Sequence, residues 1–112
     1  MLKQLDHRPD GNFVPVQTLR RDLDTLAKAF HLQVHKEKDD LGSIRCAYLE
    51  TTRKSKFVLF AYAHRAAPKG FVEVGILSGL KDPDTIVKDV HKELRVDKSD
   101  VLPRDVRYRE IA

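Results

Sequence analysis

The most regular hydrophobic pattern of the chain lies in its middle, between residues 57 and 77. Residues 57–63 read FVLFAYA, so apolar side chains occupy both alternating sets of positions. Because successive side chains of a strand point to opposite faces, this pattern predicts a central strand that is covered on both sides. Residues 71–77 and 43–51 predict two further strands. Residues 43–77 are therefore expected to form a three-stranded antiparallel meander with short loops.

Two other segments repeat their apolar residues every three or four positions, which predicts amphipathic helices. The first helix is expected to start at Pro15, because the missing N–H of proline would have no partner in the first turn. Its apolar positions are Val16, Leu19, Leu23, Leu26, Ala27 and Phe30. The second helix is expected to have Asp82 as its N-cap and Pro83 at its first position. Its apolar positions are Ile86, Val87, Val90 and Leu94.

The remaining segments predict shorter elements. Residues 32–35 predict a short strand, and residues 36–40 predict a charged turn. Residues 106–111 alternate as a last strand, which their charges would keep at the sheet edge. Residues 1–12 are expected to form a loose arm or an edge strand. Together these elements predict one α+β domain over residues 1–112. An antiparallel sheet of four to five strands is expected to form one layer, and two helices the other. The predicted order of elements along the chain is α-β-β-β-β-α-β.

The central strand needs a cover on the sheet face that lies opposite the helices. The two predicted helical stripes are expected to cover one side only. The other side could be covered by the N-terminal arm, through Leu2, Leu5 and Phe13, or by a second copy of the chain across a two-fold axis. The second copy is the favoured expectation, which makes the protein a homodimer.

Composition indicates a small soluble protein. The 112 residues suffice for one domain that buries a core without metal or disulfide bonds. A hydrophobic content of 41% excludes a disordered chain, and no apolar run approaches the roughly 20 residues that a membrane span needs. Cys46 is the single cysteine, and the N-terminus has no apolar segment of the secretory type. We therefore expect a cytoplasmic protein without membrane contact.

The net charge of +4 is concentrated in the middle third of the chain. Residues 41–80 contain six basic and two acidic side chains, whereas both flanking thirds are balanced. Two basic loops flank the central strand and lie about 23 Å apart, at about 3.3 Å per residue. Only an extended acidic partner, either a protein surface or a nucleic acid, could touch both loops. The candidate binding residues are Arg45, Arg53, Lys54, Lys56, Arg65 and Lys69, together with Arg107 and Arg109 of the last strand.

No pattern of residues predicts a metal site or an active site. His31 and His35 are four residues apart, but the first helix is expected to end between them. Cys46 lies within a predicted strand, where a buried and unreactive thiol is expected. None of the four serines is part of a nucleophile elbow. We therefore expect no metal, no cofactor and no enzymatic activity.

Residues 69–74, with the sequence KGFVEV, lie on a predicted strand just before a helix. At Lys69, Gly70 and Phe71 they resemble the RNP1 stretch of RNA-recognition motifs. The next two residues depart from that pattern, because valine and glutamate stand where the family has a small residue and phenylalanine. The resemblance implies binding of RNA or single-stranded DNA on the sheet. The alternative is that Phe71 packs in the core.

Three functions are compatible with these observations. The favoured hypothesis is a non-catalytic protein-binding module, such as a small neutralising partner of the immunity-protein or antitoxin type that blocks a toxin. The first alternative is a protein that binds RNA or single-stranded DNA with a basic strip on the sheet. The second alternative is a small enzyme whose active site is assembled from residues far apart in the sequence.

Overall fold

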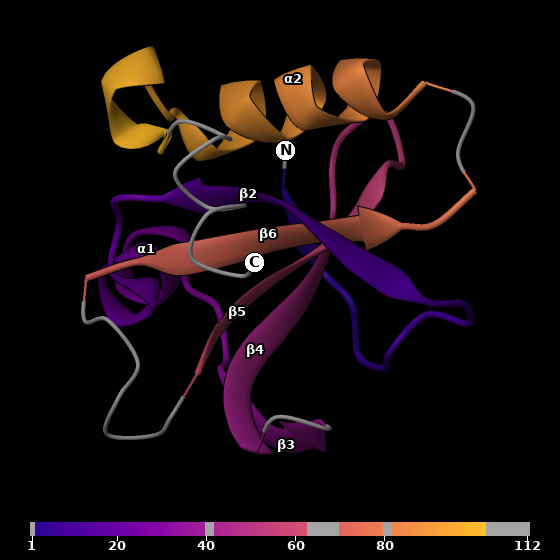
Figure 1. The fold of residues 1–112 in the computed structure, drawn as a ribbon, viewed down its shortest axis with the longest axis vertical. Coiled ribbons are helices and arrows are strands. Elements are labelled where there is room, and N and C mark those ends of the chain that lie inside the picture. The colour runs from indigo at the N-terminus through magenta and orange to yellow at the C-terminus, as the bar shows by residue number, and fades with distance from the viewer. Residues whose placement is uncertain (1, 40–41, 63–69, 80–81, 103–112) are drawn as a thin grey trace, which may run out of the picture.

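The structure of the protein is a computed structural model that describes residues 2–39, 42–62, 70–79 and 82–102. Two α-helices, one short 3-10 helix and six strands follow one another along these residues (Figure 1). They are β1 (Lys3–Gln4), β2 (Phe13–Leu19), α1 (Leu23–Phe30), β3 (His35–Asp39), β4 (Gly42–Glu50), β5 (Lys56–Tyr62), β6 (Val72–Leu77), α2 (Pro83–Leu94) and the 3-10 helix η1 (Lys98–Asp100).

The strands form one antiparallel sheet in the order β1-β4-β5-β6-β2, with β3 also paired to β4. β5 pairs with residues 44–50 of β4, whereas β3 pairs with residues 42–46 and β1 with residues 49–50. Since β5 occupies one edge of β4, β1 and β3 share the other edge. The Gln4 side chain links β1 to the segment just before β3, because it donates to the Gln33 carbonyl at 2.6 Å and accepts from the Gln33 N–H at 2.8 Å. The predicted meander is confirmed as β4-β5-β6.

Both helices pack on one face of the sheet, and α2 crosses the sheet above β2 and β6 in Figure 1. Buried side chains from helices and strands form the core between the two layers. They are Leu19, Leu23, Leu26, Ala47, Leu49, Phe57, Leu59, Val72, Val74, Ile76, Val90 and Leu94. The predicted two-layer α+β fold with an antiparallel sheet is therefore confirmed.

The opposite face of the sheet carries a smaller apolar cluster. Its buried members are Cys46, Tyr48, Val58 and Phe60. Leu5 and Phe13 pack against this cluster, and the rings of Phe13 and Tyr48 lie 5.7 Å apart. Leu2, in contrast, packs against the helix-covered core. The N-terminal segment thus covers part of the second face, while the homodimer stays a prediction.

The segment before α1 is a strand, which corrects the prediction of a helix starting at Pro15. Residues Phe13–Leu19 form β2 at the edge of the sheet, where they pair with β6. Proline is compatible with this position because an edge strand needs only half of its N–H groups for the ladder. The spacing of apolar residues between Val16 and Phe30 fits one continuous helix, but a strand, a turn and a helix follow one another in this segment.

The helix α1 begins only at Leu23, after the N-cap Asp22. The Asp22 carboxylate accepts a hydrogen bond from the Thr25 N–H at 3.1 Å. A cap of this kind stabilises a helix by about 1 kcal/mol. Leu26 and Ala27 are buried, so the predicted apolar stripe is confirmed for this part of the segment.

The segment after α1 also differs from the prediction. The strand β3 covers His35–Asp39, whereas residues 32–34 are outside any strand. The residues expected to form a charged turn therefore lie mostly in a strand that pairs with β4. Charged side chains suit an edge strand because they discourage pairing with another chain. The pairing with β4, rather than the local pattern, makes this segment a strand.

The helix α2 agrees with its predicted start. The Asp82 carboxylate accepts from the Thr85 N–H at 3.3 Å, and Pro83 is the first helical residue. Among the described residues, no helix has the length and apolar composition required to cross a membrane. The predicted last strand, residues 106–111, lies outside the described residues.

A Gly75→Ala substitution is expected to destabilise the protein by about 1–3 kcal/mol through overpacking. A Cβ atom at Gly75 would lie 2.8 Å from Cγ1 of Val58 on the neighbouring strand β5. The branched valine side chain has few rotamers and cannot move aside easily. Val58→Ala should remove the clash, so the double variant should lose less stability than the sum of the single variants. Urea denaturation checks this expectation, and additive losses would contradict it.

Candidate binding groove

The turn between β4 and β5 is held against α2 by two carboxylates. The Thr51 hydroxyl donates to Asp89, and the Thr52 N–H donates to Glu93 at 2.7 Å. Asp89 and Glu93 are four residues apart and therefore lie on the same face of α2. Within the turn, the Ser55 N–H donates to the Thr51 hydroxyl oxygen at 3.1 Å. These hydrogen bonds fix the position of the turn relative to the helix.

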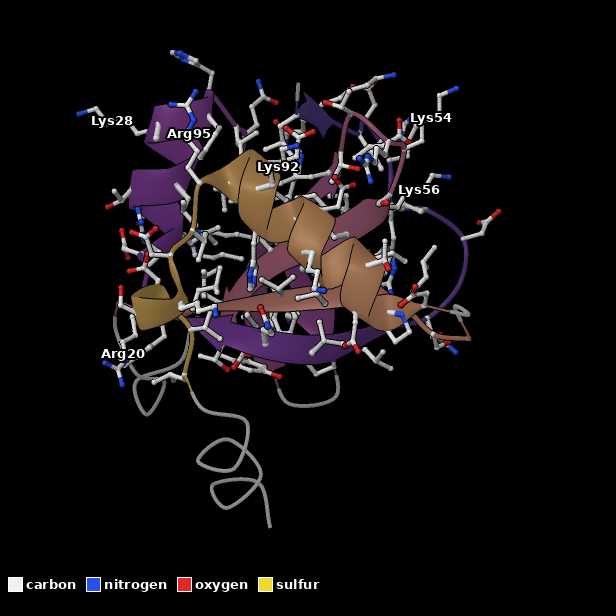
Figure 2. All side chains as sticks on the ribbon, turned by 90° about the horizontal axis from the view of Figure 1, so that it is seen from above. Arg20, Lys28, Lys54, Lys56, Lys92 and Arg95 are labelled. Atoms are coloured by element: carbon white, nitrogen blue, oxygen red, sulfur yellow. The ribbon has the colours of Figure 1, made fainter. Side chains whose placement is uncertain are left out.

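This turn presents three of the candidate binding residues to solvent. Arg53, Lys54 and Lys56 are all exposed, and Figure 2 shows Lys54 and Lys56 at the same end of the molecule. Lys54 has a left-handed backbone with a φ of 66°, which costs a residue with a side chain about 1–2 kcal/mol. The fixed turn therefore holds a cluster of cations in one place.

Arg53 also lines a groove between this turn and the C-terminal ends of both helices. The groove has a volume of about 560 Å³. It is lined by Leu2, Ala29, Phe30, His31, Thr52, Arg53, Asp89, Lys92, Glu93 and Arg95. Figure 2 shows Lys92 and Arg95 at the C-terminal end of α2, and Lys28 near the end of α1. We refer to these ten lining residues as the cationic groove.

His31 and Arg95 have the same unusual backbone conformation at the ends of the two helices. Each residue caps its helix in the left-handed region, with φ 56° and ψ 46°. Glycine is preferred at such positions because a Cβ atom makes this conformation costly. The sequence does not mark either residue as a helix cap in this groove, because neither helix end has the glycine that usually signals such a cap. Both side chains nevertheless line the cationic groove.

The groove contains an excess of available positive charge. Arg53, Lys92 and Arg95 are exposed, and none of them forms an ion pair with another described residue. The carboxylates of Asp89 and Glu93 accept hydrogen bonds from the β4–β5 turn. The hydrogen bonds from Thr52 lower the pKa of Glu93. The acidic side chains are thus engaged within the protein. The arginines and the lysine are therefore available to attract anionic groups.

Arg45, another candidate binding residue, has a different role. Its guanidinium forms an ion pair with Asp24 of α1, with one N–O distance of 3.0 Å. The hydrogen bonds to Arg45 lower the pKa of Asp24, and the same contact raises the pKa of Arg45. Arg45 fastens α1 to β4 and does not line the cationic groove.

Four candidate binding residues, Arg65, Lys69, Arg107 and Arg109, lie outside the described residues. The strip of cations along the sheet therefore stays a prediction. Within the stretch that resembles RNP1, Phe71 is half-buried and precedes β6. Glu73 accepts a hydrogen bond from Thr18 of β2 at 2.7 Å.

Within the described part of the chain, the side chains considered for chemistry do not gather in one site. Residues 2–39, 42–62, 70–79 and 82–102 contain no group of three or more histidine, cysteine, aspartate or glutamate side chains that could hold a metal ion. The helix α1 ends at Phe30, before both His31 and His35, so these two histidines do not share a helix face. Cys46 is fully buried, and burial raises the pKa of its thiol to about 11. A thiol in this state is a poor nucleophile.

A second cavity lies between β2 and α2, where His91 meets Gln17. A hydrogen bond joins Nε2 of His91 to Oε1 of Gln17. His91 is half-buried, and this burial lowers the pKa of its imidazole. The folded protein therefore favours the neutral imidazole.

Stability is expected to fall between about pH 7.5 and about pH 5.5, partly because of His91. Below the ordinary histidine pKa of about 6.5, the unfolded chain binds a proton that the folded state binds less readily. The free energy of unfolding therefore decreases as the pH falls through this range. Urea denaturation at both pH values should show a smaller decrease for His91→Gln than for the wild type. An equal decrease in both proteins would contradict the assignment.

No protein-family model matches the chain, and no curated protein or solved structure matches it. The fold and the site define a small two-layer α+β domain with a cationic groove.

Proposed function

We propose that this protein is a non-catalytic binding module that holds an acidic segment of a partner protein in the cationic groove. The proposal rests on the convergence of Arg53 from the β4–β5 turn with Lys92 and Arg95 from the end of α2. Apolar side chains, including Leu2 and Phe30, line the same groove. An acidic peptide with apolar side chains could pair its carboxylates with the cations and bury its apolar groups between them.

The composition of the groove favours a protein partner over a nucleic acid. Asp89 and Glu93 interrupt the cations of the groove, and a nucleic-acid backbone carries a negative charge at every phosphate, whereas a peptide can place uncharged side chains opposite these two carboxylates. Binding of single-stranded nucleic acid also relies on exposed aromatic rings that stack on bases. Among the described residues, Val14 is the only large hydrophobic side chain that is exposed. A protein that binds RNA or single-stranded DNA is therefore the alternative that the experiment must exclude.

A small neutralising partner of the immunity-protein or antitoxin type would use such a groove. A protein of this type binds its target tightly and needs no catalytic group of its own. The acidic segment would then belong to a cytoplasmic toxin.

The experiment uses a fluorescently labelled peptide of alternating glutamate and leucine, and measures its anisotropy at about 50 mM salt, where screening is weak. The wild-type protein should bind the peptide in a saturable manner. Combining Arg53→Glu, Lys92→Glu and Arg95→Glu should weaken binding about a hundredfold or more, because hydrogen bonds to charged groups contribute about 1.5–3 kcal/mol each. The matched control combines Arg20→Glu, Lys36→Glu and Lys38→Glu, which change the net charge equally at exposed positions outside the groove.

Arg95→Gly separates binding from folding. Glycine relieves the left-handed conformation of Arg95, so this variant should gain about 0.5–1 kcal/mol of stability. It should still bind the peptide about tenfold more weakly, because it lacks one cation. Equal losses in the groove and control variants would contradict the proposal. A labelled oligothymidylate of equal charge provides the comparison. If the wild-type protein binds it more tightly than the peptide, and the groove variants lose this binding, the nucleic-acid alternative is established instead.

A further inference from the structure

The cavity between β2 and α2 has the size and lining of a small-molecule site. Its volume is about 600 Å³, within the range of about 300–1,000 Å³ that is typical of ligand pockets. β2 provides one wall, α2 provides the opposite wall, and η1 with the two residues that follow it closes one side. Figure 1 shows α2 extending across the sheet above β2. We refer to this space as the α2–β2 cavity.

A bulge in β2 shapes one wall of the cavity. The register with β6 shifts between Pro15 and Gln17, so that Val16 is the additional residue. Val16 packs against the helix-covered core, and Gln17 bonds to His91 of α2, so two consecutive residues face the helix layer. In a regular strand these residues would point to opposite faces. Bulges often direct a side chain toward a functional site in this way.

The other walls contribute apolar side chains that the fold holds in place. Val87, Val101 and Leu102 line the cavity and are only half-buried. Two backbone hydrogen bonds fix the end of η1 and the segment after it to the end of β2. The Arg20 N–H donates to the Asp100 carbonyl at 2.6 Å, and the Leu102 N–H donates to the Thr18 carbonyl at 3.0 Å. The cavity therefore offers a preformed apolar lining to a ligand.

The polar groups of the cavity have a net positive charge. Lys88 of α2 and Lys98 of η1 line it together with one acidic side chain, Asp84. Asp82 lies near Lys88 but bonds to Thr85 as the helix cap. Lys98 forms no ion pair with another described residue. A ligand with an apolar body and one negative charge would complement this arrangement.

We propose that the α2–β2 cavity binds a small apolar carboxylate. Its hydrocarbon body would contact Val16, Val87 and Val101, and its carboxylate would pair with Lys98 and Lys88. The proposal is independent of the cationic groove, because the two sites share no lining residue.

Three ligands with the same hydrocarbon chain test this proposal, namely octanoate, octanol and octylamine. Chemical shifts of backbone amides measured by NMR report both the affinity and the location of each ligand. Octanoate should shift the amides of the cavity residues and bind about tenfold or more tightly than octylamine, because charge-assisted contacts favour the anion. Lys98→Glu should weaken octanoate binding about tenfold, whereas Lys36→Glu on β3 should leave it unchanged.

Val87→Phe should also abolish octanoate binding, because the larger ring fills the cavity without changing its charge. Three outcomes would overturn the proposal: equal affinity for the acid and the amine, shifts confined to residues outside the cavity, or no saturable shift of the wild type. Shifts at the cationic groove alone are a case of the second outcome. They would overturn the proposal for the α2–β2 cavity without bearing on peptide binding in the groove.

Discussion

Replacing Phe57 with alanine is expected to lower the free energy of unfolding by about 3–5 kcal/mol, the usual cost of deleting a buried aromatic ring. Phe57 is fully buried in β5, where its neighbours in the adjacent strands are Leu49 and Ile76. These residues are all part of the core beneath the two helices. The cavity left by the ring would lie at the centre of the sheet, where the backbone cannot easily move inward.

Urea denaturation followed by circular dichroism measures this loss. Val14→Ala is the matched control, because Val14 also lies in a strand but is 41% exposed. Its change in stability should stay within about 0.5 kcal/mol. A loss for Phe57→Ala no larger than that of the control would show that the core is not organised around β5.

Replacing Asp89 with alanine is expected to cost about 1–3 kcal/mol, because the Thr51 hydroxyl then lacks its acceptor. Thr51 is only 3% exposed, so water cannot easily replace the carboxylate. The same substitution removes one of the two side-chain hydrogen bonds that hold the β4–β5 turn against α2. Because Asp89 also lines the cationic groove, the substitution removes a negative charge there, so stability rather than peptide binding is the measurement that tests this contact.

A double-mutant cycle with Thr51→Val tests the hydrogen bond itself. The two substitutions remove the same interaction, so their combined loss should be smaller than the sum of the single losses. Asp84→Ala, at an exposed position in the first turn of the same helix, serves as the control and should change stability by about 0.5 kcal/mol or less. Strictly additive losses for Thr51→Val and Asp89→Ala would show that this bond does not fix the turn.

The sequence alone determined those elements whose signals are local. The apolar residues in 57–63 and 71–77 predicted two central strands, because a strand covered on both faces needs apolar side chains on both. Asp82 and Pro83 predicted the start of α2, because a cap depends on residues only a few positions away. The two-layer α+β class followed from these elements and is confirmed.

Tertiary pairing decided the elements with ambiguous local patterns. Residues Phe13–Leu19 fit a helical spacing, but pairing with β6 and the position at the sheet edge make them a strand. Residues 36–40 were predicted to form a charged turn, but β4 provides a partner that makes residues 36–39 part of the strand β3. The pairing of β2 with β6 joins segments far apart in the chain, whereas β3 and β4 are consecutive strands. The local pattern of apolar residues reveals neither pairing.

The candidate groove was only partly visible in the sequence. Arg53 could be identified from the charge of the middle third, whereas His31, Lys92 and Arg95 belong to regions whose net charge is balanced. Arg45 was equally conspicuous in the sequence, yet it is paired with Asp24. Charge counting identifies which cations exist, but only the packing of the helix ends against the β4–β5 turn determines which of them converge. The sequence therefore determined the core of this protein, and the tertiary structure determined its surface site.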